Sequence, residues 1–150
     1  MYKTSFTRIF LIAILVTCTF AILPQPAFAQ TPNNMSPIRI QFDKQGGANG
    51  IWNGTVSGDV DGDLTTQLLT AQQSGPILHV TFVWIINADE HSFTAVLEGT
   101  LNTINGQVEM DGTVVEGWLV GAQVHEAGQL VDPEIGRFLG NITIFPATAD

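Results

Sequence analysis

The 150-residue sequence contains one cysteine, one tyrosine and five basic residues. Cys18 and Tyr2 both lie in the first thirty residues, as do two of the basic residues, Lys3 and Arg8. A chain that loses this segment has no thiol, which excludes disulfides, thiol nucleophiles and cysteine-ligated metal sites. Its core must therefore be stable without a covalent cross-link.

The first thirty residues have the layout of a secretory signal peptide. Lys3 and Arg8 precede a nearly unbroken apolar run over residues 9–23, and Ala27-Phe28-Ala29 forms a small-x-small cleavage site. The apolar run is shorter than the roughly 20 residues that a permanent transmembrane helix needs. We therefore predict cleavage after Ala29, a secreted or periplasmic protein, and no membrane span once the leader is removed.

Positive charge is scarce in the predicted mature chain. Arg39, Lys44 and Arg137 are its only cations, against fourteen acidic residues, which gives a formal charge of −11. Such a field repels phosphate backbones and anionic lipid headgroups. Nucleic acids and membrane surfaces are therefore not expected as partners.

A helical pattern is also missing, because no segment has an apolar stripe with a period of about 3.6 residues. Apolar and polar residues instead alternate in eight runs, each closed by turn residues. Asp61-Gly62 and Asn105-Gly106 are typical of hairpin turns because these residue types tolerate a positive φ. The runs are Ile38–Asp43, Ile51–Val60, Asp63–Gln73, Ile77–Asn87, Ser92–Asn102, Gln107–Glu116, Trp118–Gln129 and Arg137–Phe145.

Short turns between consecutive runs predict a meander in which each strand pairs with the next. Such a sheet has two exposed edges unless it closes on itself. We therefore predict an all-β fold, a single antiparallel up-and-down barrel of about eight strands over residues 38–146. A flexible lead-in at 30–37 precedes it and a tail at 147–150 follows it. A β-sandwich is the alternative.

Large aromatic side chains provide the candidate ligand site. Alternation places Trp52, Trp84 and Trp118 on the inward face of three different strands, and Phe82 shares the face of Trp84. An eight-stranded barrel can hold one small ligand, so these four side chains form the predicted wall of a site for an apolar or aromatic molecule. The alternative is that they only fill the core.

Residues suited to catalysis or metal binding are few. His125 and Glu126 are the candidate acid–base pair, although no nucleophile signature accompanies them. Asp59, Asp61 and Asp63 are clustered carboxylates of the kind that a hard cation binds. They lack the glycine and glutamate spacing of an EF-hand loop, and a charged hairpin turn is the alternative. We expect neither a metal nor a cofactor.

Gly50-Ile51-Trp52 opens the first long strand and Arg137 opens the last. These positions resemble the Gly-x-Trp motif and the late arginine of the calycin barrels, the lipocalins and their relatives. The resemblance implies that Arg137 packs over Trp52 and closes the base of the barrel. The meander is also similar in plan to the allene oxide cyclase and dirigent barrels, a likeness of architecture that does not fix a function.

The sequence thus predicts an exported barrel that binds a small apolar or aromatic molecule without converting it. One alternative is an isomerase or cyclase of the allene oxide cyclase or dirigent kind, in which the barrel shapes a reactive substrate and His125 or Glu126 acts on it. The other is a structural or self-associating envelope protein. Its contact would be the outward apolar pair Val83 and Ile85, which a second copy of the chain or the N-terminal segment would cover.

Overall fold

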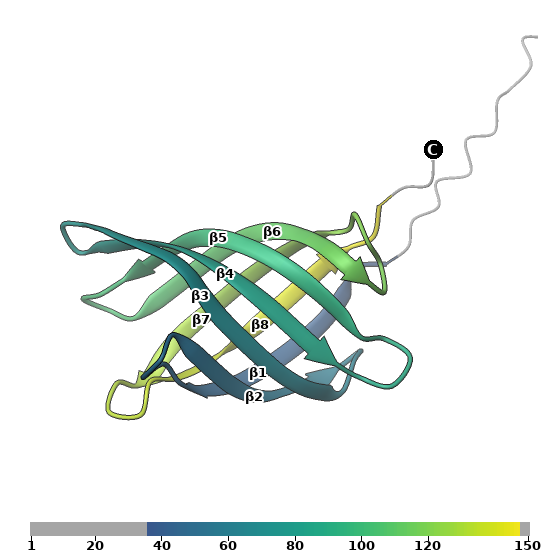
Figure 1. Cartoon of the computed structure of the whole chain (residues 1–150), viewed down its shortest axis with the longest axis horizontal. Helices are drawn as coiled ribbons and strands as arrows, with labels where there is room; N and C mark the ends of the chain where they lie inside the picture. Colours follow the sequence, from purple (N-terminus) through teal and green to yellow (C-terminus); the bar gives the residue numbers. More distant parts are fainter. Residues whose placement is uncertain (1–35, 148–150) are drawn as a thin grey trace, which may run out of the picture. The chain divides into compact units, whose positions relative to one another are not determined.

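The computed structural model describes residues 36–147. The predicted signal peptide and its cleavage site, and most of the lead-in and tail, lie outside the described residues. Each strand pairs antiparallel with the next, and the last pairs with the first to close a barrel (Figure 1). The strands are β1 (Ile38–Gly46), β2 (Ile51–Gly58), β3 (Gly62–Ser74), β4 (Ile77–Asn87), β5 (Phe93–Asn102), β6 (Gln107–Gly117), β7 (Gln123–Asp132) and β8 (Arg137–Phe145).

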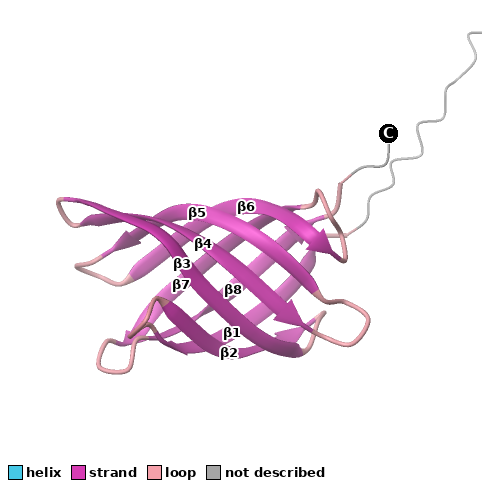
Figure 2. Ribbon diagram, viewed as in Figure 1, coloured by secondary structure: helices cyan, strands magenta, loops and turns pink. Residues whose placement is uncertain are grey.

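The closed sheet of eight strands confirms the predicted up-and-down barrel and rejects the sandwich alternative. Strands and turns account for the described residues in Figure 2. Over residues 36–147, no helix is long and apolar enough to cross a membrane.

The first strand is longer than predicted. It continues past Asp43 to Gly46, because Gln45 and Gly46 still pair with Asn53 and Trp52 of β2. The glycines that follow Lys44 in the sequence suggested an earlier turn. The extension places Lys44 inside a strand, with the same alternation as the residues before it.

The start of the seventh strand is predicted wrongly. Residues 118–122 form a turn, and β7 begins at Gln123. Leu119 and Gly121 have φ angles of 61° and 87°, far from the negative φ of regular β-structure. The amide of Gly121 donates a hydrogen bond to the carbonyl of Val114, which closes the turn.

Alternation along the strands fills the barrel with apolar side chains. In β4, Val80, Trp84 and Ile86 are buried, and Val83 and Ile85 between them lie half-buried on the outer surface. What covers Val83 and Ile85 in solution stays a prediction. One face of each strand thus builds the core, as the period of two requires.

The two ends of the barrel differ. At the packed end (right in Figure 1), inward side chains such as Phe93 and Ile144 are almost completely buried. At the open end (left in Figure 1), several inward side chains are only half-buried. The turns at the packed end are 59–61, 88–92 and 118–122. Those at the open end are 47–50, 75–76, 103–106 and 133–136.

Candidate functional site

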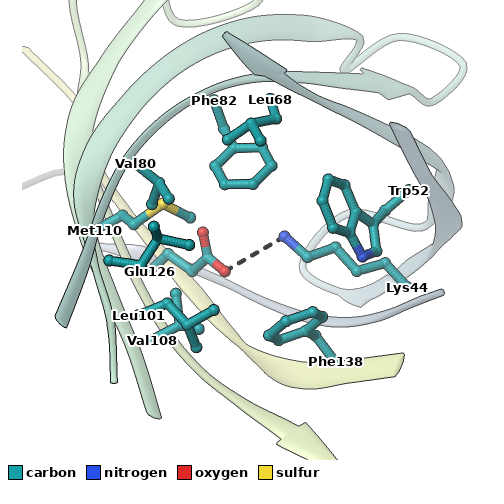
Figure 3. Close-up of a pocket in the computed structure, with 11 residues that line it drawn as sticks. Lys44, Trp52, Leu68, Val80, Phe82, Leu101, Val108, Met110, Glu126 and Phe138 are labelled. Atoms are coloured by element: carbon teal, nitrogen blue, oxygen red, sulfur yellow. Dashed lines mark ion pairs between the residues drawn. The ribbon is translucent and has the colours of Figure 1, made fainter. Parts of the chain in front are cut away.

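A cavity of about 100 Å³ lies inside the open end of the barrel. Every strand contributes to it, and its walls are apolar except for one lysine and one glutamate (Figure 3). The lining residues are Lys44, Trp52, Leu68, Leu78, Val80, Phe82, Leu101, Val108, Met110, Glu126 and Phe138. The cavity is thus an apolar cup with one pair of opposite charges.

Lys44 enters the cup from β1. Ile40, Phe42 and Lys44 alternate inward along this strand, and Lys44 is 4 % exposed. Gly54 of β2 lies opposite Lys44 in the register, and a Cβ there would clash with the carbonyl oxygen of Asp43. The absence of a side chain at Gly54 therefore lets the two strands approach closely at this point.

Aromatic rings surround the Lys44 amine. Its Nζ lies 3.8 Å from the centroid of the Trp84 ring, 5.1 Å from that of Phe42 and 5.4 Å from that of Phe82. The ring of Phe138 completes the group at 5.8 Å. Cations are attracted to the faces of such rings, most strongly where water is excluded. The cluster therefore stabilises a positive charge at the Nζ position.

Glu126 reaches the same place from β7, which is separated from β1 by β8 alone (Figure 3). It is 1 % exposed, and its Oε1 lies 3.6 Å from the Nζ of Lys44. That separation is an ion pair rather than a hydrogen bond. Neither carboxylate oxygen has a hydrogen-bond partner in the described part of the chain. A buried carboxylate without such partners is energetically unfavourable, so this group is poised to accept one.

Burial shifts both protonation equilibria toward neutrality. It raises the pKa of Glu126 to about 7, against the opposing attraction of the Lys44 charge. It lowers the pKa of Lys44 to about 8, again against the attraction of its partner. Loss of water disfavours the charged form of each group. Near neutral pH both groups can therefore exchange a proton, which is typical of functional sites.

The structure brings together two of the four predicted wall residues. Trp52 and Phe82 both line the cup, with ring centroids 5.4 Å apart in an edge-to-face arrangement. Trp84, 1 % exposed, lies against the amine of Lys44 and is not part of the lining. Trp118 lies in the 118–122 turn at the packed end, where the centroids of its ring and of the His91 ring are 4.3 Å apart. Ligand contact by Trp52 and Phe82 stays a prediction.

The structure places His125 and Glu126 on opposite faces of β7, so the two side chains do not meet. His125 lies on the outer face of β7, where its Nδ1 is 2.8 Å from Oδ1 of Asp111. Glu126 points into the cup, because neighbouring residues on a strand face opposite sides of the sheet. The ion-pair partner of Glu126 is Lys44, which the sequence alone did not single out.

Asp59 and Asp61 of the acidic cluster accept hydrogen bonds from backbone amides around the β2–β3 turn. Oδ2 of Asp59 accepts a hydrogen bond from the amide of Arg39 at 2.8 Å, and Oδ1 of Asp61 accepts one from Gly58 at 3.3 Å. Asp63 pairs with β4 in the sheet. Among the residues that the structure describes, no three His, Cys, Asp or Glu side chains gather as a metal site. The arrangement matches the alternative of a charged hairpin turn.

Arg137 lies on the outer surface of the barrel. Its guanidinium holds the carboxylate of Asp43 with two hydrogen bonds, one of 2.9 Å from Nε. These bonds hold the pKa of Asp43 below its usual range. The indole of Trp52 donates to the carbonyl of Gly136 at 3.1 Å. Over residues 36–147, the cation that lies over aromatic rings is therefore Lys44 and not Arg137.

Comparison of the chain with protein-family models, curated proteins and solved structures found no match. The chemistry of the cup is therefore the basis on which a function is proposed.

Proposed function

We propose that the open end of the barrel binds a small, mostly apolar molecule that carries one polar group. The observation that carries this proposal is the carboxylate of Glu126, which is paired with Lys44 but has no hydrogen-bond partner within residues 36–147, in a cavity that is otherwise apolar. The hydrophobic walls provide affinity, and the two polar atoms orient the ligand, which is the usual division of labour in small-molecule sites.

The size of the cup limits the ligand. Apolar cavities of about 150 Å³ accommodate a molecule as large as benzene. The cup of about 100 Å³ therefore takes a short alkyl chain or part of one ring. Leu68, Leu78 and Leu101 are half-buried at its mouth, so a longer ligand would extend between the turns of the open end.

The charged pair favours a ligand with a hydroxyl, carbonyl or carboxyl group. A hydrogen bond to a charged partner contributes roughly 1.5–3 kcal/mol. We therefore expect benzyl alcohol to bind at least about tenfold more tightly than toluene, which has the same ring without the hydroxyl.

A binding experiment with a blocked cup tests this function. Leu101→Trp places an indole at the mouth, and we expect it to weaken binding of benzyl alcohol and pentan-1-ol at least about tenfold, because the added ring competes for the same space. Val120→Trp adds the same ring at the other end of the barrel, where Val120 is 60 % exposed, and should leave affinity unchanged. Isothermal titration measures both. A wild-type protein with a normal β circular dichroism spectrum that binds no member of this panel would overturn the proposal.

Glu126 also favours a second candidate, an isomerase or cyclase. A carboxyl group with a pKa of about 7 in an apolar cavity can take a proton from carbon and return it elsewhere at neutral pH. Lys44 would then stabilise the developing negative charge from 3.6 Å away. The residues of this candidate are Glu126 and Lys44, without His125.

Conversion of cyclohex-3-enone to its conjugated isomer tests this second candidate. We expect the wild-type protein to accelerate the reaction, followed by ultraviolet absorbance. Glu126→Gln should slow it at least about a hundredfold, because the proton carrier is lost. Glu109→Gln, a matched change on the exposed face of β6, should have no effect. If the isomerisation is no faster with the wild-type protein than in buffer, the isomerase candidate is wrong and the binding function is favoured.

A further inference from the structure

Stability does not explain a lysine at position 44. An ammonium group buried in an apolar cavity loses several kcal/mol of solvation, which one carboxylate only partly restores. A methionine of similar length would fill this place without that loss. Arg39 and Arg137, the other cations of the described chain, both lie on outer faces of their strands. The inward position of Lys44 therefore calls for a chemical explanation.

The surroundings suit an iminium ion better than an ammonium ion. An ammonium has three N–H donors, and aromatic rings offer them no oxygen acceptor. The one ion-pair partner of Lys44 within residues 36–147 is Glu126. An iminium formed on the same nitrogen keeps the positive charge beside the Trp84 ring but has a single N–H donor, which one carboxylate satisfies.

We propose that Lys44 forms an imine with a small apolar aldehyde or ketone that enters the cup, and that Glu126 carries the protons of this reaction. The inference rests on the proposed binding function and names the ligand class of that same cavity. Carbonyl compounds fit because their carbon can reach the amine while the alkyl or aryl group lies against the apolar walls.

The reaction needs no further reactant. The lone pair of the neutral amine attacks the carbonyl carbon, a C–N bond forms, and the carbonyl oxygen takes the proton that nitrogen releases, through Glu126. The carboxylic acid of Glu126 then protonates the resulting hydroxyl group, the C–O bond breaks, and water leaves as nitrogen forms the C=N bond. The products are an iminium, one water molecule and the Glu126 carboxylate, which stays as the counter-ion.

Protonation near neutral pH supports this chemistry. With a pKa of about 8, roughly a quarter of Lys44 is neutral and nucleophilic at pH 7.5. An ordinary lysine is neutral in only about one molecule in a thousand at that pH. No other titratable side chain of the described residues lines the cup, and His125 acts on Glu126 only from the outer face.

Reductive trapping tests the proposal. The full chain is incubated with pentanal and cyanoborohydride at pH 7.5, and peptide mapping by mass spectrometry locates the pentyl group. The sequence has two lysines, so Lys3 of the full chain serves as the internal reference. The terminal amine does not, because an α-amine has an ordinary pKa of about 8 and is as often neutral at pH 7.5 as Lys44 is. We expect one pentyl group on Lys44, formed roughly a hundredfold faster than on Lys3.

Variants separate the roles of the two residues. Lys44→Arg keeps a cation but has no nucleophilic amine, and should lose the adduct. The wild-type rate should decline above pH 7, where Glu126 loses the proton that it donates to the hydroxyl group. Glu126→Gln should slow trapping at least about tenfold and remove this decline, because the amide cannot carry a proton. An unchanged rate and pH profile in Glu126→Gln would remove Glu126 from the proposal.

Titration with pentan-1-ol distinguishes the failure of this inference from the failure of the proposed function. If the alcohol binds but pentanal leaves Lys44 unmodified, the imine proposal is wrong and the binding site stands. If neither compound binds, both proposals are wrong. Equal modification of Lys44 and of Lys3 would show ordinary lysine reactivity and also overturn the imine proposal. Mapping is done on the wild-type chain, so the result does not depend on a variant that folds.

Discussion

Replacing Glu126 with leucine is expected to lower the free energy of unfolding by about 3–5 kcal/mol at pH 7.5, where both groups of the pair are mostly charged, because it leaves the buried Lys44 charge without a counter-ion. Leucine is close to glutamate in volume, so the loss comes from electrostatics rather than from a cavity. The loss should shrink above pH 8, where Lys44 sheds its proton. Urea denaturation followed by tryptophan fluorescence measures it.

The double variant Lys44→Met/Glu126→Leu should recover most of this loss. Buried ion pairs replaced by apolar residues of similar size leave stability unchanged or raise it by about 1–4 kcal/mol. The cup would then be apolar throughout, and a dry apolar cavity is tolerated. A double variant whose loss equals the sum of the two single losses would contradict this account, because it would mean that the two groups do not interact.

The ion pair between Asp43 of β1 and Arg137 of β8, on the outer surface of the barrel, is the matched control. Asp43 and Arg137 are each more than 40 % exposed at the side chain, so water already solvates both. Surface pairs of this kind contribute about 1 kcal/mol or less. Asp43→Asn should therefore lower stability by no more than that amount. A comparable loss for Asp43→Asn and Glu126→Leu would mean that burial is not the cause.

The barrel itself could be predicted because its signals are local. Alternation with a period of two specifies strands, and short turns such as Asp61-Gly62 specify which strands pair. Turn glycines were the main source of error. Gly46 suggested a turn where pairing with Trp52 continues, and Gly117 and Gly121 bracket an apolar segment that turns instead of extending. In each case a distant segment also takes part, because the amide of Gly46 donates to the carbonyl of Ile135 and that of Trp118 to the carbonyl of Ser92.

The pairing of Lys44 with Glu126 could not be predicted from either strand alone. Alternation with Phe42 is the signal that points Lys44 inward, once the strand is known to extend that far. Glu126 likewise shares the face of the buried Val124. Their approach inside the barrel depends on closure and on the register of β8, which lies between β7 and β1. Alternation within a strand contains neither piece of information.

The stability of the wild-type protein is expected to pass through a minimum between about pH 7 and pH 8. Burial raises the pKa of Glu126 from 4.5 to about 7, so the folded protein keeps a proton that the unfolded chain releases. Its stabilising contribution is complete below pH 4.5 and is lost as pH rises to 7. Burial lowers the pKa of Lys44 from 10.5 to about 8, so stability rises again from pH 8 to 10.5 as the unfolded chain gives up its proton.

Each limb of this profile should be on the order of 3 kcal/mol, since one pKa unit corresponds to about 1.4 kcal/mol. Thermal unfolding followed by circular dichroism measures it, as a drop in Tm of roughly 10 °C between pH 4.5 and 7.

The other acidic groups also titrate, so the informative quantity is the difference between the wild type and the Lys44→Met/Glu126→Leu variant, which retains all of them. Asp43 acts in the opposite sense and only in acid, because its lowered pKa gives stability that is lost as pH falls below 3.8. Parallel profiles for the two proteins would mean that water or an ion solvates the pair in solution, and the cup would then lack the desolvated charges on which its proposed ligand chemistry depends.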